Sequence, residues 1–133
     1  MLTSLDLSDN ALCGVKYRRG SYDASGIQAL AEALKVNGVL TELDLADNDI
    51  GDKGATALAS ALEVNGVLTS LDVGFSKLTE EAALGIVRVE RQRNKLTSLG
   101  LGGCQIGPTG AAEIAEYVSG SGVLPCVGSC ESV

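Results

Sequence analysis

The sequence predicts an α/β solenoid in which every repeat adds one short parallel strand to a concave sheet and one helix to the convex side. Three observations support this fold class. A nine-residue segment that starts at Leu40 returns at Leu68 and again at Leu96, which gives a constant 28-residue period. A helical pattern of apolar residues follows each copy. Each helical pattern is followed by a glycine or an asparagine at one repeat position, a residue type that commonly ends helices.

The strands are expected where leucine or valine alternates with polar residues at the start of each copy. The expected ranges are 4–7, 42–45, 70–73 and 98–101. The first copy begins at Leu2, and its distance from Leu40 exceeds the period by ten positions. We refer to the copies that begin at Leu2, Leu40, Leu68 and Leu96 as repeats 1 to 4. The extra residues of repeat 1 place an insertion at 13–25, on the loop that leads from the strand to the helix.

The array is expected to stop after repeat 4. A fifth copy is due at Leu124, but Pro125 cannot donate to a strand ladder and Ser129 replaces a core leucine. The domain organisation that follows is an array of about four repeats over 1–124 and an irregular C-terminal tail over 125–133.

The helices are expected between successive strands, near 24–36, 53–64, 80–92 and 108–119. Acidic residues mark two of the starts, and Pro108 stands in a first turn, where its missing N–H is not needed. The expected stops are in register, at Gly38, Gly66, Asn94 and Gly122. These residue types tolerate the left-handed conformation that often terminates a helix.

The strand segments also share the pattern L-x-x-L-x-L-x-x-N/C, which is the signature of leucine-rich repeats. With its 28-residue period, the chain resembles the ribonuclease-inhibitor-like class of leucine-rich repeat proteins. The resemblance implies a horseshoe arc that binds other proteins. It also implies that the side chain just past each strand bonds backbone groups of the neighbouring turn, as a structural ladder. The ladder residues would be Asn10, Asn48, Ser76 and Cys104.

Composition indicates one domain of 133 residues without catalytic or metal chemistry. The chain has no histidine, so the commonest general base and metal ligand is missing. We therefore expect no enzyme activity, no cofactor and no metal site. No long apolar run and no secretory leader are present, so direct membrane insertion is not expected.

The four cysteines fall at unlike repeat positions, which favours a reducing compartment such as the cytoplasm. Cys126 and Cys130 could instead pair within a disulfide-bonded cap, and the sequence leaves their pairing open.

The net charge is −7, and the charged residues are not spread evenly. Alternation along the strands places Asp6, Asp44 and Asp72 in one column, with Glu42 beside them. Phe75 is expected at the rim, where it could anchor a partner or lie partly buried. The column could attract a basic segment of a partner, or it could be a solvated filler of this repeat position. Nucleic acid is disfavoured as a partner because phosphates would be repelled.

The insertion carries a second set of candidate contact residues. Tyrosine and arginine are frequent interface anchors. The candidates are Lys16, Tyr17, Arg18, Arg19 and Tyr22. The alternative interpretation is that the tyrosines fold back over the start of the array.

The N-terminal end is a third candidate contact surface. No segment of this sequence precedes the first strand to cover Leu5, Leu7 and Leu12. We therefore expect another segment or another chain to cover this end, and the insertion to lie near it.

These expectations favour a protein-interaction module or a small scaffold subunit, with the protein partner not identified. The resemblance also leaves open a regulator of an enzyme, either inhibitory or GTPase-activating-like. A third alternative is the repeat fragment of a larger receptor-like protein.

Overall fold

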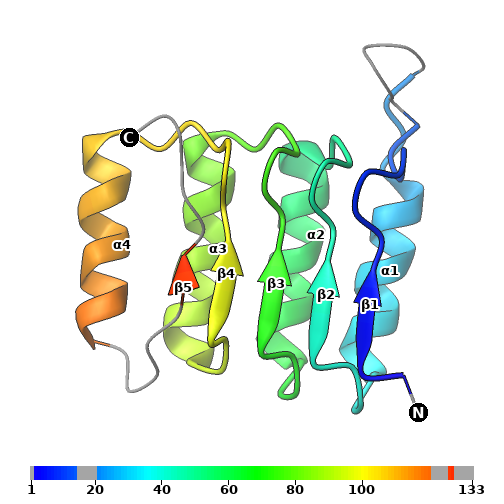
Figure 1. Ribbon diagram of the computed structural model, residues 1–133, viewed down its shortest axis with the longest axis horizontal. Helices are drawn as coiled ribbons and strands as arrows, with labels where there is room; N and C mark the ends of the chain where they lie inside the picture. Colours follow the sequence, from blue (N-terminus) through cyan, green and yellow to red (C-terminus); the bar gives the residue numbers. More distant parts are fainter. Residues whose placement is uncertain (1, 15–20, 121–125, 128–133) are drawn as a thin grey trace.

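The computed structural model describes residues 2–14, 21–120 and 126–127 (Figure 1). Strands and helices alternate along the chain. The strands are β1 (Ser4–Asp6), β2 (Glu42–Asp44), β3 (Ser70–Asp72), β4 (Ser98–Gly100) and β5 (Cys126–Val127). The helices are α1 (Ser25–Val36), α2 (Gly51–Val64), α3 (Glu80–Arg93) and α4 (Pro108–Gly120). Apart from β5, these bounds fall within two residues of the ranges that the repeat period predicts.

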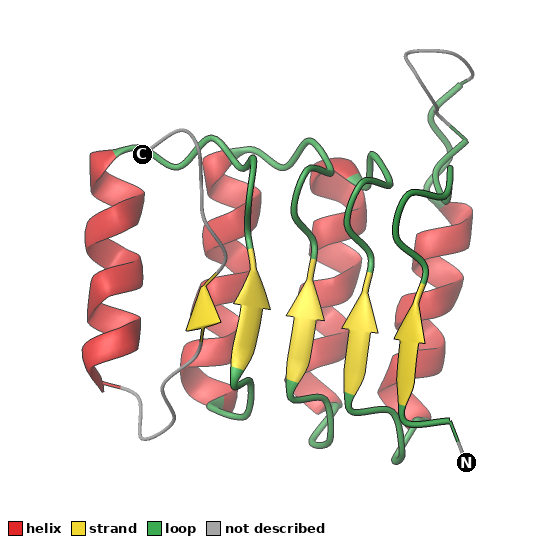
Figure 2. Cartoon of the chain, viewed as in Figure 1, coloured by secondary structure: helices red, strands yellow, loops and turns green. Residues whose placement is uncertain are grey.

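All strands form one sheet in chain order, and every neighbouring pair is parallel. The helices form a second layer on one face of the sheet (Figure 2). The predicted α/β solenoid is therefore confirmed. We call the other sheet face, lined by the outward residues of β1 to β4, the concave face.

The register follows the repeat without slippage. Leu5 is paired with Leu43, Leu43 with Leu71, and Leu71 with Leu99. Side chains at these positions point to the helix layer, where Leu58, Leu62 and Ile86 meet them in one continuous core. Because strand side chains alternate, the polar residues between the leucines must face away from the helices.

The expected irregular tail over 125–133 needs correction at two residues. Val127 pairs with Leu99, its equivalent one repeat earlier, so β5 continues the array one strand beyond β4. Pairing in a sheet uses backbone groups, and the amide that Pro125 lacks lies outside the paired residues.

The expected left-handed stops are found at only one of the first three helices. Asn94 has φ 53° and ψ 47° at the end of α3. α1 and α2 end at Asn37 and Asn65, which are extended. At these two helices the asparagine side chain ends the helix in place of a left-handed glycine, because its Oδ1 accepts two N–H groups of the segment that leads to the next strand. Among the described residues, no helix has the length and apolar character needed to cross a membrane.

Candidate functional site

The concave face brings the predicted acidic residues together. Parallel pairing places Asp6 beside Asp44 and Asp44 beside Asp72, so the three carboxylates form a column across β1, β2 and β3. Glu42 lies exposed at the edge of this column and accepts a hydrogen bond from Ser4 Oγ at 3.3 Å. The face is hollowed into a depression of about 350 Å³. Its lining includes Asp6, Glu42, Asp44, Asp72 and Gly100.

The aspartates also have a local structural role. The Oδ1 atom of each accepts the backbone N–H two residues further on, at 2.9 Å for Asp6, 3.0 Å for Asp44 and 2.8 Å for Asp72. These bonds hold the chain where it leaves each strand. A short polar acceptor at this position is therefore useful to the fold, and a column of negative charge is the consequence.

The electrostatics of the column are unfavourable within the chain itself. In the part of the chain that the structure describes, no lysine or arginine forms an ion pair with Asp6, Asp44 or Asp72. Burial, followed by the neighbouring carboxylates of Asp72, Asp6 and Asp47, raises the pKa of Asp44. The exposed Asp6 at the end of the column has a lowered pKa, because Ser8 donates hydrogen bonds to it. A cation at the middle of the column would relieve this repulsion.

The concave face changes character towards β4, where glycine replaces aspartate. A Cβ atom at Gly100 would lie 2.4 Å from Cγ of Asp72, so the missing side chain leaves room for the Asp72 carboxylate. In the same way, a Cβ atom at Gly103 would lie 2.6 Å from Cδ1 of Phe75. The glycines of repeat 4 therefore let two side chains of repeat 3 lie over its backbone.

Phe75 stands at the rim of this glycine region with an unusual backbone. Its side chain is 49% exposed and its φ is +52°. The same repeat position is left-handed in every repeat, at Asp9, Asp47 and Gly103. Aspartate and glycine are common in that conformation, whereas a bulky aromatic residue is a clear outlier. An exposed aromatic ring held in a costly conformation is a candidate contact residue.

The insertion is only partly described, since Lys16, Tyr17, Arg18 and Arg19 lie outside the described residues. Tyr22 folds back onto the array, as one of the two interpretations anticipated. Its hydroxyl donates to the carbonyl of Ile50, and its ring lies against Gly51. Tyr22 still exposes 44% of its surface, so it both fastens the end of the insertion and remains accessible.

The ladder residues have the hydrogen bonds expected of their position. Asn48 is buried, its Oδ1 accepts the Asn10 N–H at 3.0 Å, and its Nδ2 donates to the Leu7 carbonyl at 2.8 Å. Ser76 Oγ accepts the Asn48 N–H at 3.1 Å. Cys104 is buried as a free thiol, with its Sγ 4.0 Å from the Gly102 carbonyl oxygen. Asn48 and Ser76 tie successive turns together, and the ladder residues give no sign of a binding role.

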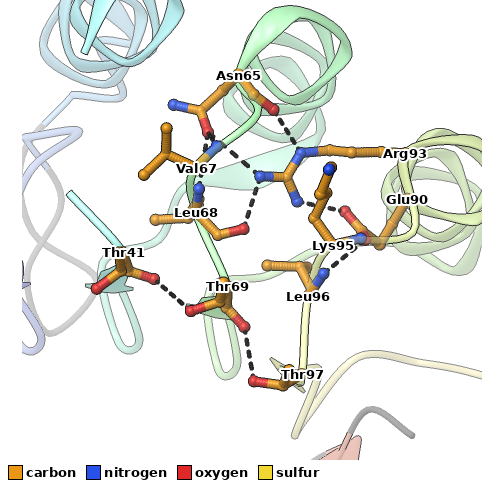
Figure 3. Close-up of polar contacts among 10 residues, drawn as sticks. All are labelled: Thr41, Asn65, Val67, Leu68, Thr69, Glu90, Arg93, Lys95, Leu96 and Thr97. Atoms are coloured by element: carbon orange, nitrogen blue, oxygen red, sulfur yellow. Dashed lines mark hydrogen bonds and ion pairs between the residues drawn. The ribbon is translucent and has the colours of Figure 1, made fainter. Parts of the chain in front are cut away.

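A second ladder, which sequence reasoning missed, runs along the other end of the strands. The threonine hydroxyls of Thr41, Thr69 and Thr97 each donate to the carbonyl of the threonine one repeat earlier, at 3.1 to 3.2 Å. Figure 3 shows the bonds from Thr69 and Thr97. The recurrence of threonine at this position of each repeat was the available signal.

Sequence reasoning also missed a buried ion pair within α3 of repeat 3. In repeat 2, Asn65 Oδ1 accepts the N–H groups of Val67 and Leu68, both at 2.9 Å. In repeat 3, Glu90 Oε2 accepts the two equivalent N–H groups, at 2.6 and 2.8 Å. Glu90 is completely buried and pairs with Arg93 at 2.8 Å. Glu90 therefore performs in repeat 3 the task of the asparagine.

Arg93 completes this substitution by bonding the segment that joins repeats 2 and 3. Its guanidinium donates to the backbone carbonyls of Asn65 and Leu68, both at 2.6 Å (Figure 3). The signal was available in the sequence, because Arg93 stands where Asn37 and Asn65 stand in repeats 1 and 2. This network stabilises the array at the turns where helices end and the next strands begin.

The comparisons with known proteins agree with this architecture. A family model described as "Leucine Rich repeat" matches residues 1–12, 36–59 and 93–115. No curated protein sequence matches the chain. A solved structure titled "Leiomodin-1 Actin-Binding Site 2" is 24% identical, with a TM-score of 0.79. The match covers 97% of this chain and 71% of that one.

A second similar structure is the tropomodulin C-terminal domain of Caenorhabditis elegans. It is 18% identical with a TM-score of 0.79, and the match covers 99% of this chain and 76% of that one. Likeness at this level of identity concerns the fold. The constant repeat period, the parallel sheet with its ladders, and the matched repeat segments together identify the fold as a leucine-rich repeat solenoid.

Proposed function

We propose that this chain is a protein-interaction module, or a small scaffold subunit, whose concave face binds a basic segment of a partner protein. The observation that carries the proposal is the column of Asp6, Asp44 and Asp72, which no described cation neutralises. Burial first and the neighbouring carboxylates second raise the pKa of Asp44, so a lysine or arginine from a partner would find a complementary site.

The two halves of the concave face define what the partner should present. The half formed by repeats 1 and 2 is acidic, with Glu42 widening the column. The half formed by repeats 3 and 4 adds Asp72 to the column, and it is otherwise lined by serines and glycines and bordered by Phe75. The partner should therefore carry basic residues next to an apolar one, which would contact the exposed ring. Nucleic acid would be repelled by the same column.

The proposed setting is a reducing compartment such as the cytoplasm. Cys13 and Cys104 are both buried, and neither of them forms a disulfide. The neighbour titled an actin-binding site makes actin the first purified protein to test as a partner. Binding through the column predicts strong salt dependence for any partner, since exposed charges are screened by salt.

The proposal is tested by two variants that change the net charge equally. Asp44→Asn removes the central carboxylate and keeps an oxygen that can accept the Ala46 N–H. Glu63→Gln removes an exposed carboxylate of α2, on the convex side. Actin and lysine-containing peptides are titrated against both variants at several salt concentrations.

We expect Asp44→Asn to weaken binding and flatten its salt dependence, and Glu63→Gln to leave both unchanged. Equal effects of the two variants would show that only net charge matters and would contradict a specific concave site.

A further inference from the structure

The outer edge of β1 carries backbone groups whose equivalents in β2, β3 and β4 each form hydrogen bonds with the preceding repeat. In each later repeat, two N–H groups at the strand start donate to the threonine carbonyl of the preceding repeat. Those of Thr41 and Glu42 reach the Thr3 carbonyl at 2.8 and 3.0 Å. In each later repeat, a strand carbonyl also accepts an N–H from the preceding repeat. The Asp44 carbonyl accepts the Leu7 N–H at 2.8 Å.

The same pairs recur between repeats 2 and 3 and between repeats 3 and 4. Thr69 and Ser70 donate to the Thr41 carbonyl, and the Asp72 carbonyl accepts the Leu45 N–H. Thr97 and Ser98 donate to the Thr69 carbonyl, and the Gly100 carbonyl accepts the Val73 N–H. The side of a strand that faces the preceding repeat is therefore a template for one parallel strand. The same hydrogen bonds form at all three junctions between repeats 1 to 4.

In repeat 1 the template is open. The corresponding groups are the N–H groups of Thr3 and Ser4, the Asp6 carbonyl and the Oδ1 atom of Asn10. Among the described residues none of these groups has a partner, whereas Asn48 Oδ1 accepts two N–H groups from repeat 1. An unpaired row of this kind is a ready site for another strand.

The apolar side of the same edge is also incomplete. Leu5 and Leu7 are only partly buried, whereas Leu43 and Leu45, their equivalents in repeat 2, are 2% and 0% exposed. Leu2 exposes 63% of its surface. A strand laid against β1 would cover these leucines with its own inward side chains.

Charge identifies the occupant. The outward position of an added strand beside Asp6 would continue the acidic column, where a further carboxylate would be repelled and a cation attracted. An acidic or neutral strand would gain the backbone bonds without this attraction. The edge therefore selects for an extended segment with lysine or arginine at its outward positions and apolar residues at its inward ones.

We propose that the basic segment of the partner binds as an additional strand, parallel to β1 and hydrogen-bonded to its open edge. This inference rests on the proposed function and specifies how the segment is held. Main-chain bonds to Thr3, Ser4 and Asp6 supply affinity, and the outward cation beside Asp6 supplies selectivity.

The probe is a nine-residue peptide with the chain's own sequence 2–10 that carries S4K and D6K. Two control peptides isolate the two contributions. The first keeps the native sequence 2–10 and so lacks the cations. The second contains the lysines and is N-methylated at the position of Leu7, which removes the donor to the Asp6 carbonyl. Binding is followed by NMR titration and by amide hydrogen exchange of the intact protein.

We expect the lysine peptide to slow exchange of the Thr3 and Ser4 amides at least about tenfold. The N-methylated peptide should bind about tenfold more weakly, as expected for a lost main-chain bond and a disrupted strand. A spin label at the peptide's N-terminus should broaden signals near Thr3. Broadening near Asn10 would overturn the parallel orientation.

Two matched protein variants separate edge addition from binding across the concave face. Asp6→Asn should weaken the lysine peptide by up to about fivefold, the range of one exposed ion pair, and Asp72→Asn should have a smaller effect. Perturbation centred on β3 and Phe75, without protection of Thr3 and Ser4, would overturn edge addition and leave the proposed function standing. Equal binding of the lysine and native peptides at low salt would overturn the proposed function itself.

Discussion

The buried pair of Glu90 and Arg93 makes Arg93→Ala the most informative stability variant of this chain. The Glu90 side chain is 0% exposed and the Arg93 side chain 5%, and their closest atoms are 2.8 Å apart. Removal of the guanidinium leaves the Glu90 carboxylate buried without its counter-charge. It also leaves the carbonyls of Asn65 and Leu68 without the two 2.6 Å hydrogen bonds from Arg93. Breaking a buried pair from one side costs about 3 to 5 kcal/mol.

That loss is large for a domain of this size, because small domains unfold with about 5 to 15 kcal/mol. Urea denaturation followed by circular dichroism measures it directly. The matched control is Arg91→Ala, since Arg91 is 50% exposed and lies 3.5 Å from Glu116. An exposed pair contributes at most about 1 kcal/mol.

A double variant tests the physical reason for the loss. Glu90→Gln keeps an oxygen for the N–H groups of Lys95 and Leu96 and removes the buried charge. The combination with Arg93→Ala should therefore be more stable than Arg93→Ala alone. A loss below about 1 kcal/mol for Arg93→Ala, equal to that of the control, would refute the role assigned to this network.

Three further predictions concern the concave face and the core. Asp44→Asn should raise stability slightly at pH 7, because the raised pKa of Asp44 means that folding disfavours its charged form. The wild type should gain stability as the pH falls through that pKa, and the variant should not. Urea titrations between about pH 4 and 7 would show the difference. Phe75→Asn should leave the free energy of unfolding within about 1 kcal/mol of wild type, because relief of the left-handed backbone strain offsets the loss of the half-buried ring. Calorimetric titration should show that the variant binds the partner more weakly. A large loss of stability with unchanged binding would make Phe75 a structural residue. Burial raises the pKa of Tyr117 to about 12. Wild-type stability should therefore decline between about pH 10 and 12, where the unfolded chain loses the tyrosine proton first. Tyr117→Phe should remove that part of the decline, and an identical alkaline stability profile in the variant would contradict the prediction.

The sequence predicts the repeated parts of this structure well because they depend on a period. Strand positions follow from leucines that recur once per repeat, and Asp6, Asp44 and Asp72 fall in one column because each occupies the same outward position of its strand. The ladder positions follow from the same spacing. Each of these features is encoded independently in several repeats, so one divergent repeat does not obscure it.

The features that the sequence does not reveal are those in which one repeat departs from the others. In the sequence, Arg93 marks only a departure from the asparagine of repeats 1 and 2. Side-chain packing is needed to show that Glu90, three residues earlier in α3, acts together with it. The left-handed backbone of Phe75 is hidden for the same reason, because phenylalanine gives no local signal for that conformation. β5 is hidden because Pro125 and Ser129 weaken its pattern, although the backbone of Val127 still pairs.

The most direct test of the acidic concave face is the salt dependence of association for a basic partner segment. The association rate of the lysine peptide is measured from about 20 to 300 mM salt with wild type, Asp44→Asn and Glu63→Gln. We expect the rate to decline steeply with salt for wild type and Glu63→Gln and less steeply for Asp44→Asn. Three identical slopes would contradict the claim that the carboxylate column guides binding.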